Sequence, residues 1–430
     1  MQRRECYGIL KPMPKTHKRK TILILGAGFA GLAAALTLEK LRRRVEYNVI
    51  LVDKNCYHLY HALLYEVATA AIDITEPDLI ALQSGVCIRI KALQDIFLKK
   101  KINVMQEIIT GIDLADNRVK LEQGGEVMYD ALIFALGSQS NDFHIPGLAE
   151  HSISMKELPD ALAIHLKIDA LLRRAGAKGR GKIVIGGGGV SGVEVAGELR
   201  HYLLTLARQG RINPTRFEVN LIEAGPTLLP GMTPWVQANT MERLRDLGVT
   251  VRVGEPITSV DDQYVRLKDG TTHGYDLFVW SGGIQGHELV TSLGVPLIGK
   301  RQVGVTNELS IPGHDNVYVI GDAMFFIDDI TKRPVPQVAQ VAIGQGRQAA
   351  RNIVARSRGL AAKPYRPSML GYVFPVGGRW AISTVGFNLK GWPAWVLRKL
   401  VDLKYFLSIV SFTNALRVWY RGGRAYLTND

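Results

Sequence analysis

Two glycine patterns, each followed by an acid, are the residues of this 430-residue chain that best suit a cofactor site. The first is Gly26-Ala-Gly28-Phe-Ala-Gly31, with Asp53 about 20 residues further on. In this pattern the first glycine allows a tight turn, the second lets the backbone approach a diphosphate, and the third lets a helix pack closely on a strand. The acid can accept hydrogen bonds from an adenosine ribose. The stretch therefore predicts a nucleotide site.

The second pattern is Gly187-Gly-Gly189-Val-Ser-Gly192, and the acid that follows it is Glu223. The spacing to the acid is longer than in the first pattern, and we interpret residues 206–216 as an inserted loop. Because an acid at this position repels a 2′-phosphate, Glu223 predicts NADH rather than NADPH. Two such patterns in one chain predict a duplicated dinucleotide fold.

The elements that must position these residues can be read from the runs around them. The predicted strands are 21–25, 49–52, 182–186 and 217–222, and the predicted helices are 32–40 and 193–199. Two more apolar strands end in Gly137 and Gly283, where the backbone can approach a ligand closely. Asp322 ends a further strand, and a predicted helix follows at 337–347. Asp322 can hold a polyol hydroxyl or cap a helix, and the sequence leaves both open.

Composition sets the broad class. Apolar residues make up 47 % of the chain and 44 residues are glycine, which suits an α/β protein of two or three domains. The net charge of +14 indicates an anionic partner, either membrane lipid or nucleic acid. Three cysteines, Cys6, Cys56 and Cys87, form no C-x-x-C pair, which favours a reducing compartment.

Several kinds of segment and site are not expected. No uncharged apolar run reaches the roughly 18 residues of a membrane-spanning helix. Residues 1–19 are basic but lack the apolar core of a signal peptide, and we predict a flexible leader. His58 and His61 lie three residues apart, but no third ligand follows nearby, so no metal site is predicted.

The last sixty residues mix aromatic and basic side chains. Within them, five apolar residues follow spacings of four and three and share one helical face: Val396, Leu400, Leu403, Leu407 and Val410. Arg398, Lys399 and Asp402 fall on the other side. This pattern predicts an amphipathic helix in a membrane interface. A surface helix packed on the body of the protein, or a dimer contact, remains an alternative.

Two nucleotide folds in one chain suggest a hydride carrier and a redox cofactor. Nicotinamide delivers a hydride, and a flavin can accept it and release the electrons singly or in a pair. We assign FAD to the N-terminal fold and NADH to the inner fold. Asp53 then meets the adenosine of FAD, Asp322 lies near its ribityl chain, and Glu223 meets the ribose of NADH.

The chain resembles the type II NADH dehydrogenases, single-subunit NADH:quinone oxidoreductases that pump no protons and belong to the two-dinucleotide-binding-domain flavoproteins. The resemblance covers nearly all of residues 20–420. It rests on both glycine patterns and on the longer stretches Leu63-Leu-Tyr-Glu-Val-Ala-Thr69, Gly321-Asp-Ala323, Ala339-Gln-Val-Ala342 and Ala394-Trp-Val-Leu-Arg-Lys-Leu-Val-Asp-Leu-Lys-Tyr-Phe-Leu407.

The resemblance implies an α/β fold with two Rossmann-like domains, each of three layers (ββα), and a C-terminal membrane-associating helical region. The expected divisions are a leader (1–19), an FAD domain (20–145 and 290–370), an NADH domain (146–289) and the C-terminal region (371–430). FAD is expected to be non-covalent, with NADH as substrate and a membrane quinone as acceptor. The protein is expected to sit peripherally on the cytoplasmic face of the membrane, on anionic lipid and not on nucleic acid, with a homodimer as a possibility.

Site residues carry over from the resemblance by position. The FAD positions that match are Gly26, Gly28, Gly31, Asp53, Lys54, Gly137 and Asp322, with Gln337 or Val338 near the isoalloxazine ring. The NADH positions that match are Gly187, Gly189, Gly192, Glu223 and Gly283. Glu194 matches a glutamate near the meeting point of nicotinamide and flavin, although a carboxylate just inside a helix N-terminus also suits the helix dipole.

The family's quinone-side pattern, Ala-Gln-x-Ala-x-Gln, is only partly present. Gln340 matches its first glutamine, but Gly344 occupies the second position and Gln345 follows one place later. One residue turns a side chain by about 100° around a helix, so Gln345 is not a simple substitute. This departure concerns the acceptor pocket and not the flavin or NADH positions.

Three related activities compete with this interpretation. A disulfide reductase or NADH oxidase of the single-cysteine type needs a cysteine roughly ten residues after the first acid, and Cys56 comes only three after Asp53. A sulfide:quinone oxidoreductase needs cysteines in the central and C-terminal parts, and none follows Cys87. An NADH-sensing flavoprotein of the apoptosis-inducing type would use the C-terminal region as a partner surface.

Overall fold

The computed structural model describes residues 19–42, 47–69, 87–89, 102–175 and 180–429. They form two compact units. The first contains the described residues within 1–59, 88–139 and 284–369, and the second those within 60–87, 140–283 and 370–430. Cys6 and all but the last residue of the basic leader lie outside the described residues.

The unit boundaries lie close to the predicted domain boundaries, with two regroupings. The segment that begins at Tyr60 belongs to the second unit, and so does the C-terminal region, which was predicted as a separate division. The chain therefore crosses between units more often than the four predicted divisions imply. Which unit binds which nucleotide stays a prediction.

The first unit is built on a six-stranded sheet. Its strands, in spatial order, are β22 (Ser310–Ile311), β23 (His314–Val319), β9 (Ala131–Phe134), β1 (Thr21–Leu25), β2 (Asn48–Asp53) and β5 (Ile102–Gln106). All neighbours except β22 and β23 pair in parallel. Parallel strands covered on both faces are apolar throughout, and Ile22, Leu23, Ile24 and Leu25 indeed have no exposed surface.

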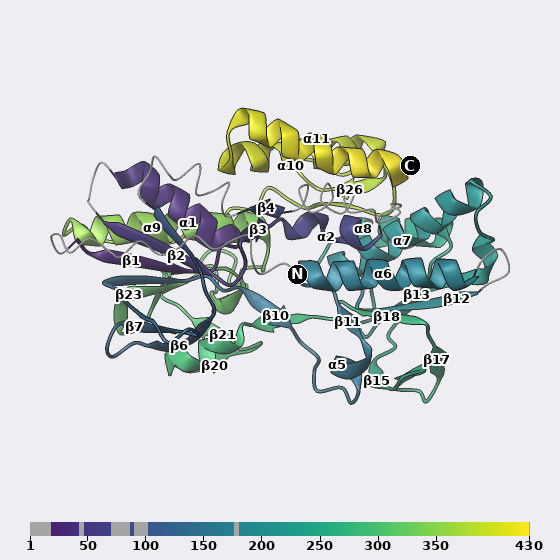
Figure 1. Cartoon of the computed structure of the whole chain (residues 1–430), viewed down its shortest axis with the longest axis horizontal. Coiled ribbons are helices and arrows are strands. Elements are labelled where there is room, and N and C mark those ends of the chain that lie inside the picture. The colour runs from purple at the N-terminus through teal and green to yellow at the C-terminus, as the bar shows by residue number, and fades with distance from the viewer. Residues whose placement is uncertain (1–18, 43–46, 70–86, 90–101, 176–179, 430) are drawn as a thin grey trace. The chain divides into compact units, whose positions relative to one another are not determined.

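Helices and a second sheet cover the two faces of this sheet (Figure 1). On one face lie α1 (Phe29–Leu41) and α9 (Ala339–Ser357). On the other lies an antiparallel sheet of β6 (Ile109–Asp113), β7 (Arg118–Leu121) and β8 (Glu126–Met128). The two helices pack tightly because Gly346 has no side chain, and a Cβ there would clash with the carbonyl oxygen of Ala30.

The second unit repeats this architecture. Its parallel sheet has the order β11 (Ile153–Ser154), β18 (Leu277–Trp280), β12 (Gly181–Gly186), β13 (Phe217–Glu223) and β14 (Thr250–Val253). Helices α6 (Leu158–Ala175) and α7 (Val190–Arg208) lie on one face, and the antiparallel strands β15 (Ile257–Val260), β16 (Tyr264–Leu267) and β17 (Thr272–Gly274) lie on the other (Figure 1). Val184, Phe278 and Val265 fill the core between the two sheets. The predicted α/β class with duplicated three-layer domains is confirmed.

The predicted inserted loop at 206–216 is partly wrong. Helix α7 has 19 residues where α1 has 13, and it continues to Arg208. A short 3-10 turn at Pro214–Arg216 then leads into β13. The longer spacing to Glu223 therefore comes largely from extra helix. The helix predicted at 337–347 is confirmed as α9, which begins at Ala339 and continues to Ser357.

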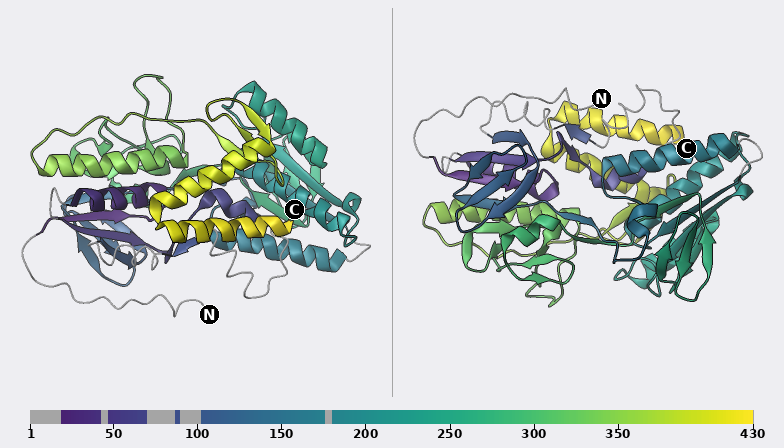
Figure 2. Two further views of the ribbon diagram at one scale, coloured as in Figure 1. Left: turned by 90° about the horizontal axis from the view of Figure 1, so that it is seen from above. Right: turned by 60° about the horizontal axis from the view of Figure 1, so that its bottom comes forward.

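Apart from α8, the remaining helices and strands are short or C-terminal. They are β3 (Tyr57–Leu59), α2 (Leu64–Ala68), β4 (Cys87–Arg89), β10 (Ser138–Ser140), α5 (Leu148–His151), α8 (Pro234–Leu247), β19 (Ile284–Gly286), β20 (Leu297–Ile298), β21 (Gln302–Gly304), β24 (Met324–Phe325), β25 (Val373–Pro375), β26 (Ala381–Ser383), β27 (Leu389–Gly391), α10 (Trp392–Ile409) and α11 (Phe412–Asn429). Helices α10 and α11 lie against each other in the second unit (Figure 2).

Helix α10 buries its polar face instead of its apolar stripe. Arg398 and Asp402 are 4 % and 1 % exposed, whereas Leu400 and Leu407 are 54 % and 41 % exposed. The predicted two-sided pattern is present, but the side with Arg398 and Asp402 packs against the protein instead of facing solvent. Every helix in the described ranges is either too short or too polar to span a bilayer.

Candidate functional site

The first glycine turn connects β1 to α1, and its three glycines occupy the positions that the pattern assigns to them. Gly26 has a φ of +99°, and a Cβ there would lie 2.5 Å from the carbonyl oxygen of Ala135. Gly28 is the N-cap of α1, and a Cβ there would meet no atom within 4 Å. A Cβ at Gly31 would clash with the carbonyl oxygen of Gly26. Glycine is thus needed for the turn at Gly26 and for close packing at Gly31, while Gly28 faces open space.

Asp53 closes this turn from the end of β2. Its Oδ2 accepts a 2.7 Å hydrogen bond from the backbone N–H of Ala27, and its Oδ1 accepts one of 2.8 Å from Asn55. Each carboxylate oxygen can accept more than one hydrogen bond, so capacity remains for a ribose hydroxyl. The acid is therefore held rigidly beside the turn.

The second turn, between β12 and α7, repeats this geometry. Gly187 has a φ of +106°, and a Cβ at Gly192 would clash with the carbonyl oxygen of Gly187. Glu223 ends β13, and its Oε2 accepts a 2.5 Å hydrogen bond from the N–H of Gly188. Its Oε1 accepts one of 2.6 Å from Gly225. Asp53 and Glu223 thus make the same contact: each accepts a hydrogen bond from the N–H of the residue after the first glycine of its turn, Ala27 or Gly188.

Both helix starts fit the diphosphate of a dinucleotide. Helices α1 and α7 begin at glycine N-caps, Gly28 and Gly189, and their first turns carry no acid. The first N–H groups of a helix have no partner within it, and they lie at the positive end of the helix dipole. An anion placed there would meet N–H groups, without a side chain in the way.

A third predicted position, the turn at Gly321–Asp322, also lies in the first unit. The carboxylate of Asp322 accepts a 2.6 Å hydrogen bond from the hydroxyl of Ser138, the residue after Gly137. Its backbone carbonyl accepts one of 2.8 Å from the side chain of Gln337. The structure thus brings Gly137, Asp322 and Gln337 together. Asp322 does not cap α9, whose N-cap is Val338.

The two glutamines of α9 have different surroundings. Gln345 is 1 % exposed, and its Oε1 accepts a 2.7 Å hydrogen bond from the backbone N–H of Gly321. Gln340 lies in the first turn of the helix and is half-buried. A Cβ at Gly344 would lie 3.2 Å from the hydroxyl of Tyr365. Gln345 therefore supports the Asp322 turn, and the ring of Tyr365 lies beside Gly344, the position at which the resemblance implies a second glutamine.

Glu194 lies in the first part of α7 and is buried. Burial raises the pKa of its carboxyl group to about 8; the charge of Arg398 opposes this shift, and Glu66 and Glu198 add to it. A carboxyl group with this pKa is mostly protonated at neutral pH, so it can donate a hydrogen bond or hold a proton. Glu194 is thus suited to proton chemistry and not only to the helix dipole.

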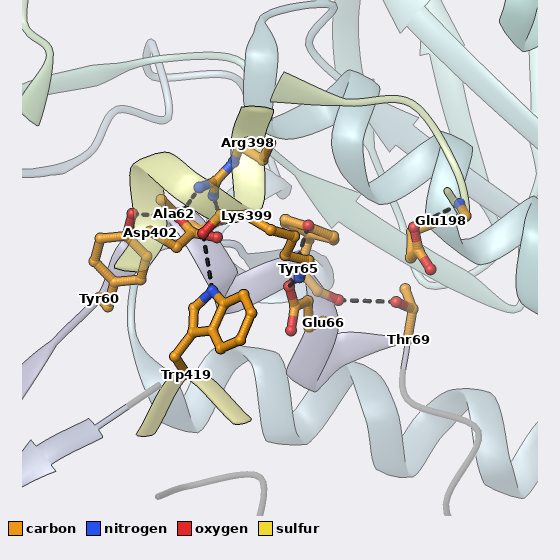
Figure 3. Close-up of polar contacts among 11 residues, drawn as sticks. Tyr60, Ala62, Tyr65, Glu66, Thr69, Glu198, Arg398, Lys399, Asp402 and Trp419 are labelled. Atoms are coloured by element: carbon orange, nitrogen blue, oxygen red, sulfur yellow. Dashed lines mark hydrogen bonds and ion pairs between the residues drawn. The ribbon is translucent and has the colours of Figure 1, made fainter. Parts of the chain in front are cut away.

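Helix α10 places two cations beside acids: Lys399 lies beside Glu66, and Arg398 beside Asp402 (Figure 3). The Nζ of Lys399 lies 3.5 Å from Oε1 of Glu66; the side chain of Glu66 is buried, and that of Lys399 is 12 % exposed. Arg398 forms an ion pair with Asp402 and donates to the carbonyl of Ala62 at 2.8 Å. Burial raises the pKa of Glu66 to about 7, although the charge of Lys399 opposes the shift.

Sequence analysis missed this network. The sequence motif gives Glu66 no partner, and helical periodicity places the charges of α10 only on the side opposite its apolar stripe. Part of this network can be predicted from the sequence, because Arg398 and Asp402 are four residues apart and can form an ion pair on one helical face. Tyr60, which bonds to Asp402, and Glu66, which bonds to Lys399, are more than 330 positions earlier in the chain, and only the fold brings these pairs together.

Two further predicted positions, Lys54 and Gly283, make contacts through their backbone carbonyls. Lys54 is exposed, and its backbone carbonyl accepts from Gln106. Gly283 accepts a backbone hydrogen bond from Asn141, and a Cβ there would touch the ring of Phe143. His58 is buried and its Nδ1 bonds to the carbonyl of Ala27. Within the described ranges, no three potential metal ligands come together.

Comparison with known proteins places the chain in a family. The sequence model described as pyridine nucleotide-disulphide oxidoreductase matches residues 20–346. The type II NADH:quinone oxidoreductase of Staphylococcus aureus (strain NCTC 8325 / PS 47) is 27 % identical over 407 residues, which cover 91 % of this chain and 96 % of the relative.

Solved structures show the same fold. NDH2 from Plasmodium falciparum, determined in complex with NADH, superposes with a TM-score of 0.81 at 17 % identity, over 95 % of this chain and 98 % of that one. The sulfide:quinone oxidoreductase of Aquifex aeolicus superposes with a TM-score of 0.73 at 20 % identity, over 94 % and 92 %. The expected resemblance to type II NADH dehydrogenases is confirmed.

Proposed function

Because the chain belongs to the pyridine nucleotide-disulphide oxidoreductase family, we propose that it is a membrane-bound oxidoreductase that passes electrons from NADH through FAD to a quinone, without pumping protons. Membership confirms the predicted oxidoreductase class and the predicted cofactors, FAD with NADH as substrate. When bound, FAD accepts a hydride from NADH and passes two electrons to the acceptor. The residue roles, the quinone and the membrane attachment are the proposal.

The first unit holds FAD in this proposal. The start of α1 binds the diphosphate, Asp53 binds the adenosine ribose, and the turn at Asp322 binds the ribityl chain. Support comes from the contacts that fix each group: Asp53 on the glycine turn, and Ser138 and Gln337 on the Asp322 turn. Because these protein groups are already held in place, binding of a cofactor does not carry the entropic cost of ordering them.

The second unit holds NADH at the start of α7. Glu223 is already bound to two backbone N–H groups and stays close to the turn. Its remaining lone pairs can accept from both hydroxyls of an unmodified ribose, whereas a 2′-phosphate would bring negative charge against the carboxylate. NADH is therefore preferred to NADPH.

Glu194 orients the nicotinamide and holds a proton in this proposal. Its buried carboxyl group is largely protonated near neutral pH, because burial disfavours the charged form. Reduction of a quinone consumes two protons as well as two electrons, so a protonated acid near the acceptor is useful. Replacing Glu194 with Ala should slow turnover more than it weakens FAD retention.

Gln340 faces the quinone in this proposal, and Gly344 changes the shape of the pocket. Gln340 is a half-buried amide one helical turn before Gly344, so both positions share a face of α9. Tyr365 lies next to Gly344, and its hydroxyl is 3.2 Å from the place of a Cβ. The pocket therefore has an aromatic wall where the family has an amide.

Membrane attachment is assigned to α10 and α11. Their exposed large apolar residues are Trp392, Leu400, Leu407, Phe412, Leu416 and Tyr420. Lys404 and Arg417 are exposed in the same helices. Apolar side chains flanked by cations suit the interface of an anionic bilayer, with the protein peripheral on the cytoplasmic face. A homodimer formed through the same residues would show as a concentration-dependent mass without vesicles.

The observation that carries the proposal is the duplicated turn, in which an acid from the next strand holds the middle N–H of each glycine pattern. The test is the visible spectrum of the purified protein. NADH should bleach the flavin bands, and a soluble quinone should restore them within a turnover time. A colourless protein that takes up no FAD would overturn the proposal. A flavin that NADH reduces but quinone leaves reduced would favour an NADH sensor.

A further inference from the structure

Ala27, the residue between the first two glycines of the N-terminal turn, has both of its backbone polar groups held by side chains. Its N–H donates to Oδ2 of Asp53 at 2.7 Å. Its carbonyl oxygen lies 2.7 Å from Nδ1 of His58. Ala27 is itself 2 % exposed, so water does not compete for either group. The two side chains together fix the orientation of both peptide planes at Ala27.

The chemistry of the contact defines the state of His58. A carbonyl oxygen can only accept, so Nδ1 must carry the hydrogen and donate it. The His58 ring has no exposed surface, and it meets the ring of Phe29 edge-on with 5.5 Å between the centroids. Burial lowers the pKa of His58 to about 4. The ring is therefore a neutral donor at physiological pH, in a fixed position.

The second glycine turn holds its middle residue in the same two-sided way, but with different groups. The N–H of Gly188 donates to Glu223, as that of Ala27 does to Asp53. The carbonyl of Gly188 accepts a 2.9 Å hydrogen bond from the backbone N–H of Leu229. The inner turn thus uses backbone where the N-terminal turn uses the His58 side chain.

We propose that His58 is a positioning residue for the flavin diphosphate. The carbonyl of Ala27 and the N–H of Gly28 belong to one planar trans peptide, and they point in opposite directions. A donor that holds the carbonyl therefore aims the Gly28 N–H away from His58, outward at the N-terminus of α1. Gly28 is the N-cap with open space around it, where an anion can approach. The inference rests on the proposed function, which assigns FAD to this turn.

Removal of the donor has a predictable cost. With His58→Leu, the buried carbonyl of Ala27 loses its partner, and the Gly28 peptide can rotate. An unsatisfied buried acceptor costs enough to weaken FAD binding roughly tenfold to a hundredfold. His58→Asn places an amide donor near the position of Nδ1 and should keep FAD affinity within a few-fold of wild type. His58→Gln places its donor further out and should fall between the two.

The experiment titrates FAD into the apoprotein of each variant and follows flavin fluorescence, with thermal unfolding and NADH KM measured alongside. His165→Leu is the matched control, because His165 is a buried histidine of α6 in the second unit. It should lower stability without a selective loss of FAD. The proposal is supported by the order wild type, Asn, Gln, Leu in FAD affinity with NADH KM unchanged.

Two results separate failure of this inference from failure of the proposed function. If Asp53→Asn weakens FAD binding but His58→Leu does not, FAD occupies the turn and only the role of His58 is wrong. If neither affects FAD, the assignment of FAD to this turn is wrong. If His58→Leu fails to fold, the Asn and Gln variants decide, and equal FAD affinity in those two overturns the inference.

Discussion

Tyr60 donates a 2.6 Å hydrogen bond to Oδ1 of Asp402, which lies 342 positions further along the chain. Asp402 also pairs with Arg398 on the preceding turn of α10, and Arg398 donates to the carbonyl of Ala62. None of the side chains of Tyr60, Arg398 and Asp402 is more than slightly exposed. Helix α10 is thus attached to the body of the second unit by charges and hydrogen bonds.

The first prediction concerns this attachment. Asp402→Ala should lower the free energy of unfolding by about 3–5 kcal/mol, because it leaves Arg398 buried without its partner. Arg398→Met combined with Asp402→Leu should recover part of this loss, because it removes the unpaired charge, although Tyr60 and Ala62 still lose their hydrogen bonds to the two side chains. Urea denaturation measures both. Leu400→Ala, exposed on the same helix, should change stability by no more than about 0.5 kcal/mol, and an equal loss there would contradict the prediction.

The second prediction concerns nucleotide choice. In wild type, Gly188 and Gly225 donate to different oxygens of Glu223, so Glu223→Gln replaces one of these acceptors with an NH2 donor and removes the charge that opposes a 2′-phosphate. The ratio of kcat/KM for NADH to that for NADPH should fall about tenfold or more, equivalent to ~1.4 kcal/mol. Asp53→Asn is the matched variant on the other turn, and it should weaken FAD retention while leaving the ratio unchanged. An unaltered ratio in Glu223→Gln would remove this residue from nucleotide selection.

The third prediction is a pH dependence. Burial raises the pKa of Glu194 to about 8 and that of Glu66 to about 7, above the ordinary value of 4.5. A raised folded-state pKa means that the native state binds more protons than the unfolded state, between about pH 4.5 and 7 at Glu66 and between about pH 4.5 and 8 at Glu194. The contribution of these two acids to the free energy of unfolding should therefore be fully present below pH 4.5 and should decline as the pH rises to 7 and 8, with a slope of up to about 1.4 kcal/mol per pH unit for each acid.

The variant that tests this dependence is Glu194→Gln, which keeps the shape of the protonated acid. Its free energy of unfolding should fall less steeply than that of wild type between pH 5 and 8. The difference in stability between the variant and wild type should therefore shift in favour of the variant as the pH rises. Glu255→Gln is a control, because Glu255 is a partly exposed acid of the same unit. Parallel stability curves for Glu194→Gln and wild type would show that Glu194 does not hold an extra proton in the native state.

The fourth prediction separates the two glutamines of α9. Gln345→Ala leaves the N–H of Gly321 without its partner, so it should destabilise the protein by about 1–3 kcal/mol and weaken FAD retention. Gln340→Ala should leave the free energy of unfolding within about 0.5 kcal/mol of the wild-type value, and it should alter the KM for quinone. Thermal unfolding, flavin content and quinone kinetics measure the two variants side by side. A quinone-specific effect of Gln345→Ala with normal flavin content would reverse these roles.

The fifth prediction concerns the exposed apolar residues of α10 and α11. Changing Leu400, Leu407 and Phe412 together to Ser should weaken binding to vesicles with anionic lipid at least about tenfold, because apolar burial is lost at each. NADH reduction of the flavin should persist. Changing Ile330 and Leu360, exposed in the first unit, to Ser is the control and should leave vesicle binding intact. Co-sedimentation gives the comparison, and equal losses would show that this surface does not select the membrane.

The sequence determined the two nucleotide turns because their constraints are local. Glycine at positions 26 and 31 follows from a positive φ and from close helix packing, and both leave a readable spacing. Asp53 and Glu223 come at strand ends within one βαβ unit, so strand, turn and acid could be placed without the tertiary structure. The same holds for the two-sided pattern of α10, which is a property of helical periodicity.

Only the tertiary structure decided which way α10 turns and what its charges meet. Arg398 and Asp402 are as polar on a solvent-facing helix as on a buried one, and their burial depends on Tyr60 and Ala62 from a distant segment. The use of Gln345 to hold Gly321, and of His58 to hold Ala27, likewise depends on contacts between separate elements. Periodicity states which residues share a face, but the partner that covers that face is chosen by packing across the whole unit.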